Sequence, residues 1–270
     1  MDPYLAATIQ LTSTPDVEGC WKQVRERVRR AAWLGARLVA TPENTLFLGA
    51  PEEKARLAET LDGETCERFA GLARELSIHL LLGSFGEKSD EPVRCYNTSV
   101  LFGPEGERLG SYRKIHLFDV DLSPEVCYQE SAHVKAGRSP VVIPTELGKI
   151  GLSVCYDLRF PEPYREEASC GAELLMVPAA FTMVTGRDHW EPLLRARAIE
   201  NQCYLIAPAQ FGRHGDVGLR ESYGHAMIID PWGQVVASVA DGQSLALAEI
   251  DLGRITQIRA ALPVGKHRRL

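Results

Sequence analysis

Short apolar runs that alternate with amphipathic segments are the feature that most restricts how this chain can fold. Residues 4–11 (YLAATIQL) and residues 36–41 (ARLVAT) read as strands, and the apolar residues between positions 17 and 31 recur at helical spacing. Thr14-Pro15-Asp16 is a helix start signal, and Gly35 is a helix stop signal. A strand, helix, strand order predicts a sheet with helices packed on one of its faces.

The order then changes. Residues 78–84, 95–102 and 108–115 are three strand-like runs joined by turn sequences, which predicts antiparallel hairpins in the same sheet. Residues 116–139 read as an irregular segment that is long enough to be a functional loop. Further strands are expected at 141–145, 149–154, 173–177, 203–207, 223–229, 234–240 and 245–251, and further helices at 51–61, 64–76, 187–201, from Pro161 and from Leu252. This mixture predicts an α/β protein with one large mixed sheet or two stacked sheets covered by helices.

The chain has 270 residues, of which 45% are hydrophobic, and no linker-like or repeated stretch interrupts it. A chain of this length can bury one large core. We therefore expect a single domain over residues 1–270.

The net charge of −6 argues against nucleic acid and anionic membranes as partners, since both select for basic surfaces. The first residues, MDPYLAATIQLTSTP, lack the cationic and apolar pattern of a signal or transit peptide. No apolar run approaches the length of a membrane span.

The seven cysteines are an odd number in a chain too large to need disulfides, which predicts a reducing, cytoplasmic environment. No two of them form a C-x-x-C pair, and none has zinc-ligand spacing from a histidine. We therefore expect no metal site.

Cys155 stands apart from the other cysteines because it ends an apolar strand and precedes the helix start signal at Pro161. A cysteine on a sharp strand-to-helix turn is held beyond the sheet, and the backbone N–H groups after it are free to bind an oxyanion. Taken alone, the segment fits a nucleophile and a buried structural cysteine equally well.

A thiol nucleophile needs a base or a nearby positive charge. Glu43 follows one predicted strand and Lys114 ends another, and strand ends are where ligand sites of α/β proteins gather. Glu43 could take the thiol proton while Lys114 stabilises an oxyanion, although each residue alone could be an ordinary surface charge. A Cys–His relay through His189 or His225 is the competing arrangement.

Three segments together resemble a known family. Pro42-Glu43, residues 112–117 (YRKIHL) and residues 154–162 (VCYDLRFPE) are similar, in order and spacing, to the three catalytic blocks of the nitrilase superfamily of carbon-nitrogen hydrolases. The resemblance extends over essentially the whole chain. It implies an α-β-β-α sandwich in which two stacked mixed sheets are flanked by helices.

The resemblance also implies roles for individual residues. Glu43 is expected to act as base, Lys114 as oxyanion stabiliser and Cys155 as the nucleophile that forms a thioester. Glu130 lies where relatives keep an accessory glutamate that orients the lysine and the substrate. No metal or organic cofactor is expected, because a thiol, a base and an ammonium suffice for acyl transfer to water. Lys135-Ala136-Gly137 departs from the family, which commonly has proline before that glycine, so the shape of the loop that carries Glu130 is open.

Residues 155–160 (CYDLRF), 185–191 and 195–202 are similar to the amidase branch of the superfamily rather than to enzymes that act on nitriles. The expected substrate is a small amide that carries carboxylates, with deaminated glutathione favoured. Arg159, Arg187 and Arg213 are the candidates for binding those carboxylates. Tyr156, Phe181 and Thr182 complete the expected substrate-binding set.

Two alternatives remain open. The first is an omega-amidase that acts on 2-oxoglutaramate or succinamate. The second is an inactive binding protein in which Cys155 is a redox-sensitive thiol. The resemblance further implies a homodimer or a higher even homo-oligomer, with Tyr223, Trp232 and the basic C-terminal tail as candidate interface residues. The stretch 212–221 (GRHGDVGLRE) is expected to select the substrate.

Overall fold

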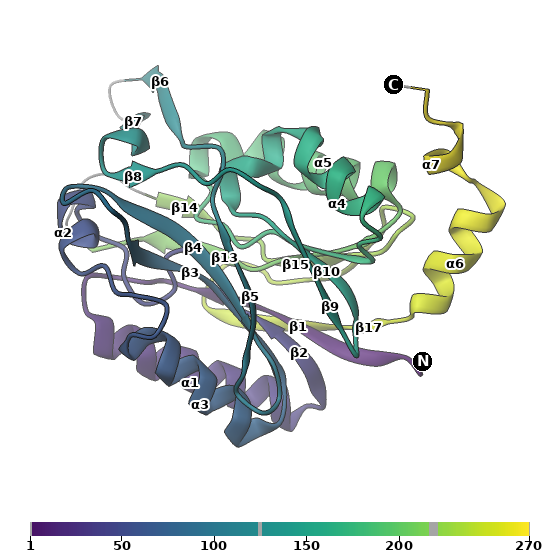
Figure 1. The fold of residues 1–270 in the computed structure, drawn as a ribbon, viewed down its shortest axis with the longest axis horizontal. Coiled ribbons are helices and arrows are strands. Elements are labelled where there is room, and N and C mark those ends of the chain that lie inside the picture. The colour runs from purple at the N-terminus through teal and green to yellow at the C-terminus, as the bar shows by residue number, and fades with distance from the viewer. Residues whose placement is uncertain (1, 124–125, 216–220, 270) are drawn as a thin grey trace.

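The computed structural model describes residues 2–123, 126–215 and 221–269. Two β-sheets lie face to face, with helices on both outer sides (Figure 1). Helices α1 (Val17–Trp33) and α3 (Glu64–Leu76) cover one side, and α4 (Pro161–Ser169) and α5 (Met183–Asn201) cover the other. The expected α-β-β-α sandwich is confirmed.

The first sheet is built from the N-terminal half of the chain together with strands that return to it from the C-terminal half. Its strand order is β14-β13-β1-β2-β3-β4-β5, with β17 also paired to β1 and β8 to β4. The bounds are β1 (Tyr4–Leu11), β2 (Ala36–Ala40), β3 (His79–Lys88), β4 (Cys95–Phe102), β5 (Arg108–Arg113), β8 (Val134–Lys135), β13 (Ala209–Arg213), β14 (Glu221–Tyr223) and β17 (Ser244–Ile250). The pairs β1/β2 and β2/β3 are parallel, while β3, β4 and β5 form the antiparallel hairpins that the sequence predicts.

The second sheet has the order β16-β15-β12-β11-β10-β9. Its bounds are β9 (Val141–Thr145), β10 (Gly148–Leu152), β11 (Leu174–Met176), β12 (Tyr204–Ala207), β15 (Met227–Ile229) and β16 (Val235–Ser238). Strands β10, β11 and β12 are parallel to one another, so their carboxyl ends share one edge of the sheet.

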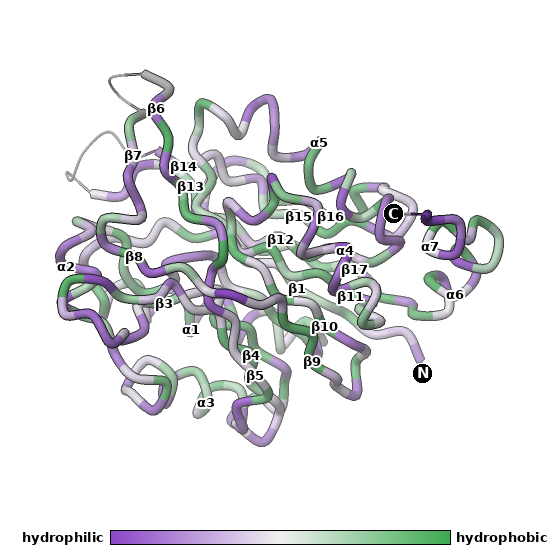
Figure 2. The backbone as a smooth tube through the Cα atoms, turned by 45° about the horizontal axis from the view of Figure 1, so that its top comes forward, coloured by the Kyte–Doolittle hydropathy of each residue, from purple (hydrophilic) through white to green (hydrophobic). Residues whose placement is uncertain are grey.

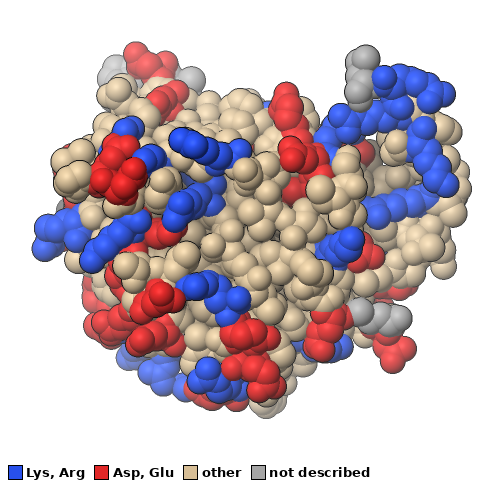
Figure 3. Space-filling view, viewed as in Figure 1, with Lys and Arg blue, Asp and Glu red and all other residues tan. Residues whose placement is uncertain are grey.

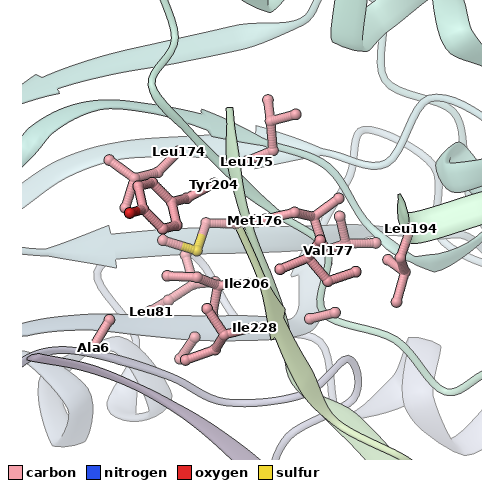
Figure 4. Packing of buried hydrophobic residues seen from close by; sticks show 14 of the residues in the cluster. Ala6, Leu81, Leu174, Leu175, Met176, Val177, Leu194, Tyr204, Ile206 and Ile228 are labelled. Carbon is pink, nitrogen blue, oxygen red and sulfur yellow. The ribbon is translucent and has the colours of Figure 1, made fainter. Parts of the chain in front are cut away.

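The core follows the alternation of side chains along each strand. In β3, Leu81 faces the second sheet, whereas Leu80 and Leu82 face the helices α1 and α3. Figure 4 shows Ala6 and Leu81 of the first sheet packed toward Met176, Ile206 and Ile228 of the second. In Figure 2, where hydrophobic residues are green, apolar stretches of the tube lie along interior strands such as β12.

Several sequence expectations differ from the structure. The strand expected at 223–229 is split between β14 in the first sheet and β15 in the second, and α5 begins at Met183, four residues before the expected helix start. Residues 116–139 are not irregular, because they contain the hairpin β6 (Asp119–Ser123) and β7 (Val126–Gln129), the short helix η1 (Glu130–Ala132) and β8. Helix α2 (Pro51–Arg56) ends five residues before the predicted end at Leu61. Strand β13 was not predicted, because it is fixed by parallel pairing with β1 rather than by its own polar sequence.

The C-terminal helices α6 (Leu252–Ala261) and α7 (Val264–His267) extend along one side of the body (Figure 1), and basic side chains gather on this arm (Figure 3). None of the helices in the described residues combines the length and the apolar character that crossing a bilayer requires.

Candidate functional site

Cys155 lies where β10 ends and the short helix η2 (Cys155–Arg159) begins. Its φ of 49° lies in the left-handed region, which is unusual for a residue with a side chain, and its N–H donates to the carbonyl of Pro178 at 2.9 Å. The sharp turn predicted from the sequence is therefore present. The N–H of Tyr156, in the first turn of η2, has no partner inside the helix because helix starts leave their N–H groups unpaired.

Asp157, which is fully buried, stabilises this turn through hydrogen bonds. Its carboxylate accepts hydrogen bonds from the N–H of Val154 at 2.9 Å, the hydroxyl of Tyr112 at 2.7 Å and the N–H of His116 at 3.0 Å. Because Tyr112 and His116 flank Lys114, this one carboxylate ties the cysteine turn to the lysine segment.

Glu43 follows β2 and is 3% exposed. Its Oε1 accepts from Asn97 Nδ2 at 2.8 Å and from Lys114 Nζ at 3.0 Å, and its Oε2 accepts from the N–H of Ala180 at 2.9 Å. The chain before Glu43 passes so close to β3 that a Cβ on Gly83 would lie 2.0 Å from the carbonyl oxygen of Thr41. A glycine is therefore required there for the carboxylate to reach this position.

Lys114 follows β5 and is 2% exposed. Its ammonium also bonds both oxygens of Glu130, at 3.1 and 2.9 Å, so that it lies between two carboxylates. The loop that carries Glu130 returns at Gly137, whose N–H donates to the carbonyl of Lys114 at 2.8 Å. A Cβ on Gly137 would lie 2.1 Å from the carbonyl oxygen of Arg113, so the glycine, rather than the missing proline, sets this contact.

The charges in this cluster shift one another's pKa values. Burial alone would raise the pKa of Glu43, but the positive charges of Lys114 and Lys54 outweigh it and hold the pKa below its usual value. Burial acts to lower the pKa of Lys114, and the charges of Glu130 and Glu43 raise it well above its usual value. Burial and the negative charge of Glu43 raise the pKa of the Cys155 thiol, which also hydrogen-bonds that carboxylate. The resting site therefore holds a thiol beside an ionised carboxylate and a charged ammonium.

These groups line a cavity of about 340 Å³. The cavity is also lined by Tyr156, Arg159, Phe181 and Thr182, all of which the sequence placed in the substrate-binding set. The guanidinium of Arg159 lies over the rings of Tyr156, at 5.7 Å, and Phe181, at 5.1 Å. The structure thus brings these four residues together with Glu43, Lys114, Cys155 and Glu130.

Other candidates lie outside the cavity. Arg187, on α5, and Arg213, on β13, are exposed and do not line it. His189 and His225 do not line it either, and His189 bonds the guanidinium of Arg159 at 3.2 Å instead. Within the stretch 212–221, His214 and Glu221 reach the cavity, while residues 216–220 lie outside the described part of the chain.

Sequence reasoning missed Asn97 and Lys54, two polar residues that contact the site. Asn97 is fully buried on β4 and donates to Glu43, and Lys54, on α2, donates to the side chain of Asn44 at 2.5 Å. A clue for Asn97 was available, because polar side chains in the middle of a strand-like run are unusual and are bonded when buried. Lys54 gave no such signal, since a lysine in a charged helix reads as a surface residue.

In the described residues, no group of three or more His, Cys, Asp or Glu side chains is arranged to hold a metal ion. The reactive groups that line the cavity include the thiol of Cys155, the carboxylates of Glu43 and Glu130 and the ammonium groups of Lys114 and Lys54.

Comparison with known proteins identifies the family. The family described as carbon-nitrogen hydrolase matches residues 5–260. Deaminated glutathione amidase of Synechocystis is 45% identical over 99% of both chains, and the human protein of that name is 47% identical over 98% of this chain and 82% of its own. The crystal structure of Saccharomyces cerevisiae Nit3, described as a member of branch 10 of the nitrilase superfamily, superposes with a TM-score of 0.89 at 29% identity and covers 99% of this chain and 97% of its own. This chain therefore belongs to the carbon-nitrogen hydrolase family, within the nitrilase superfamily.

Proposed function

We propose that the protein is a thiol amidase that hydrolyses deaminated glutathione to 2-oxoglutarate and cysteinylglycine. The observation that carries the proposal is the buried Glu43–Lys114–Glu130 cluster beside the thiol of Cys155 in one cavity. The substrate is inferred from the relatives named deaminated glutathione amidase, which match nearly all of this chain.

In the first step, Cys155 Sγ attacks the amide carbon and Glu43 takes the thiol proton. A raised thiol pKa makes this transfer necessary, since little thiolate exists before the substrate arrives. The developing oxyanion is stabilised by the ammonium of Lys114 and by the N–H of Tyr156. Glu43 then gives its proton to the leaving nitrogen, the C–N bond breaks, cysteinylglycine departs with a free amine, and the acyl group remains on Cys155 as a thioester.

In the second step, Glu43 takes a proton from water as that water attacks the thioester carbonyl. The same oxyanion-binding groups act again, the C–S bond breaks, and the thiolate recovers the proton from Glu43. Lys114 stays charged throughout, because Glu130 and Glu43 hold its pKa well above the ordinary value against the effect of burial. Glu130 acts here as a positioning residue that fixes the ammonium through two hydrogen bonds.

Substrate binding in this scheme uses Tyr156, Arg159, Phe181 and Thr182, which line the cavity. Arg159 is the guanidinium available to a carboxylate there. Because Arg187 and Arg213 do not line the cavity in this structure, a contact from either would require the chain to move.

The direct test measures hydrolysis of deaminated glutathione by the wild type, Cys155→Ala, Cys155→Ser and Glu43→Gln, with folding checked by circular dichroism. All three variants are expected to lose turnover by several orders of magnitude. Cys170→Ser changes an exposed cysteine outside this cavity and is the matched control. Wild-type turnover by either Cys155 variant would remove Cys155 as the nucleophile.

Two further measurements separate the alternatives. A higher kcat/KM for 2-oxoglutaramate or succinamate than for deaminated glutathione would make the protein an omega-amidase. Absence of a hydroxylamine-trapped acyl group with every member of a broad amide panel would favour the inactive, redox-sensitive binding protein.

We also propose that residues 1–270 form one domain that assembles as a homodimer or higher even homo-oligomer in the cytoplasm. Trp232 is 54% exposed, and Ile199, which lies against the adjacent Gly233, is exposed as well, which supports a buried apolar contact between copies. All seven cysteines are free, as suits a reducing compartment. Trp232→Glu is expected to shift the mass measured by light scattering toward the monomer, and an unchanged mass would argue against this contact.

A further inference from the structure

A second lysine enters the cavity beside the groups already described. Lys54 comes from α2, on the side of the cavity formed by the first sheet. The helix lies close to β3, since a Cβ on Gly86 would lie 3.2 Å from the carbonyl oxygen of Lys54 and 3.5 Å from its Cγ. On the same helix, Glu52 Oε1 lies 3.4 Å from Nε2 of His133, in the Glu130 loop. Lys54 is therefore placed by packing on two sides.

The ammonium of Lys54 has a neutral partner. It donates to Asn44 Oδ1, and no carboxylate in the described part of the chain forms an ion pair with it. Asn44 follows Glu43 directly and has a φ of 55°, a left-handed conformation that asparagine tolerates better than most residues. Its N–H donates to Ser84 Oγ at 2.8 Å, which helps to fix the residue that holds the lysine.

The charges around Lys54 show why an ammonium without an ionic partner can assist the binding of an anionic substrate. Glu43 and Glu130 carry two negative charges and Lys114 one positive charge, so this trio alone would repel a carboxylate-bearing substrate. Burial lowers the pKa of Lys54, and the negative charges of Glu130 and Glu43 act against that shift while the positive charge of Lys114 adds to it. An arriving carboxylate would supply the ionic partner that the ammonium lacks.

We propose that Lys54 binds the carboxylate on the acyl side of the substrate and so selects amides whose acyl group carries a carboxylate. This inference rests on the proposed function. In deaminated glutathione the acyl-side carboxylate is separated from the scissile carbonyl by two methylenes and a keto carbon, whereas the glycine carboxylate follows a whole dipeptide.

Lys54 and Arg159 enter the cavity from different sheets. The ammonium of Lys54 bonds Asn44, the residue that follows Glu43 after a strand of the first sheet, and its charge is among the main causes that lower the pKa of Glu43. The guanidinium of Arg159 lies over the rings of Tyr156 and Phe181, which follow strands of the second sheet. One cation from each sheet suits a substrate with a carboxylate at each end, and the carboxylate closer to the scissile carbonyl is matched with Lys54, beside Glu43.

The test compares ligands that differ in one carboxylate. Calorimetric affinities are measured for 2-oxoglutarate, for 4-oxopentanoate, which replaces the distal carboxylate with a methyl group, and for cysteinylglycine. The proteins are the wild type, Lys54→Met, Lys54→Arg and, as matched control, Lys22→Met, which removes an exposed charge from α1 outside the cavity. Thermal midpoints show that each variant is folded.

Lys54→Met is expected to weaken 2-oxoglutarate binding by about 10- to 100-fold while leaving 4-oxopentanoate within about twofold. Lys54→Arg should keep most of the affinity, and Lys22→Met should equal the wild type. Equal weakening of both keto acids, no weakening of either, or no binding of 2-oxoglutarate by the wild type would each overturn the inference. A loss confined to cysteinylglycine would place Lys54 on the leaving-group side and also overturn it.

Hydrolysis of deaminated glutathione is followed in parallel. If Lys54→Met loses 2-oxoglutarate affinity but the wild type does not cleave deaminated glutathione, the proposed function fails and the Lys54 assignment stands. If the wild type cleaves it and Lys54→Met changes neither the affinity nor kcat/KM, the function stands and the Lys54 assignment fails.

Discussion

The hydroxyl of Tyr112 donates to Asp157 Oδ2 at 2.7 Å and thereby joins the strand before Lys114 to the turn that carries Cys155. Both residues are buried, and burial together with the charge of Asp157 raises the pKa of Tyr112 well above its usual value, so the hydroxyl remains a donor at any working pH. The position of the lysine relative to the thiol is therefore set through this bond.

Tyr112→Phe is expected to lower the free energy of unfolding by about 2 kcal/mol, because it removes a buried hydrogen bond to a charged acceptor. It should also lower kcat by about tenfold or more through misplacement of the thiol. Urea denaturation and steady-state kinetics measure the two effects. Tyr96→Phe, in the neighbouring strand, should change neither quantity by a comparable amount; equal effects of the two substitutions would contradict the role given to the Tyr112–Asp157 bond.

Glu130→Gln tests how Lys114 is held. The substitution keeps the size of the side chain but removes one of the two carboxylate charges that pair with the ammonium of Lys114. We expect kcat to fall by about 10- to 100-fold with a smaller change in KM, since the lost interaction acts mainly on the oxyanion. Glu146→Gln, at an exposed glutamate that pairs with Arg37 outside the cavity, is the control, and a rise confined to KM would instead assign Glu130 to substrate binding.

The residues at strand ends could be predicted from the sequence, while the groups that position them could not. Cys155, Glu43 and Lys114 each follow a strand-like run, so local pattern and family blocks locate them. Asn97 and Lys54 reach the site only through the pairing of β4 with β3 and the packing of α2 on Gly86. Strand β13 likewise depends on pairing with β1. Such contacts join distant parts of the chain, and of these residues only Asn97 leaves a local sign, as a polar side chain within a strand-like run.

Glu167 is a buried carboxyl with no hydrogen-bond partner for either oxygen among the described residues. Burial and the charge of Asp157 raise its pKa well above the usual value. Between the unfolded and folded pKa values the folded protein binds more protons, so this group makes stability fall as pH rises, by about 1.4 kcal/mol per pH unit at most. Glu167→Met is expected to raise the unfolding midpoint at pH 8 more than at pH 4.5.

Glu162 is exposed on the same helix and is not among the charges that shift the pKa of Glu167, so Glu162→Met is the control and should leave this pH dependence as it is in the wild type. Thermal melts across that pH range compare the three proteins. A gain by Glu167→Met that is equal at both pH values would show that the carboxyl does not titrate in this way.

The pH profile of kcat, measured with saturating substrate, distinguishes the Glu43 scheme from a Cys–His relay. Glu43 must be ionised to accept the thiol proton, and the positive charges of Lys114 and Lys54 outweigh burial and hold its pKa below the usual value. Activity should therefore be retained as the pH falls to about 5, where an ordinary glutamate is still mostly ionised. At the other end, Lys114 should remain charged beyond about pH 9, because its pKa is raised well above the ordinary value. We expect a plateau between these limits, measured in buffers of constant ionic strength with circular dichroism to confirm folding. A bell-shaped profile with a limb between about pH 6 and 7.5 would point to an essential histidine and against Glu43 as the base.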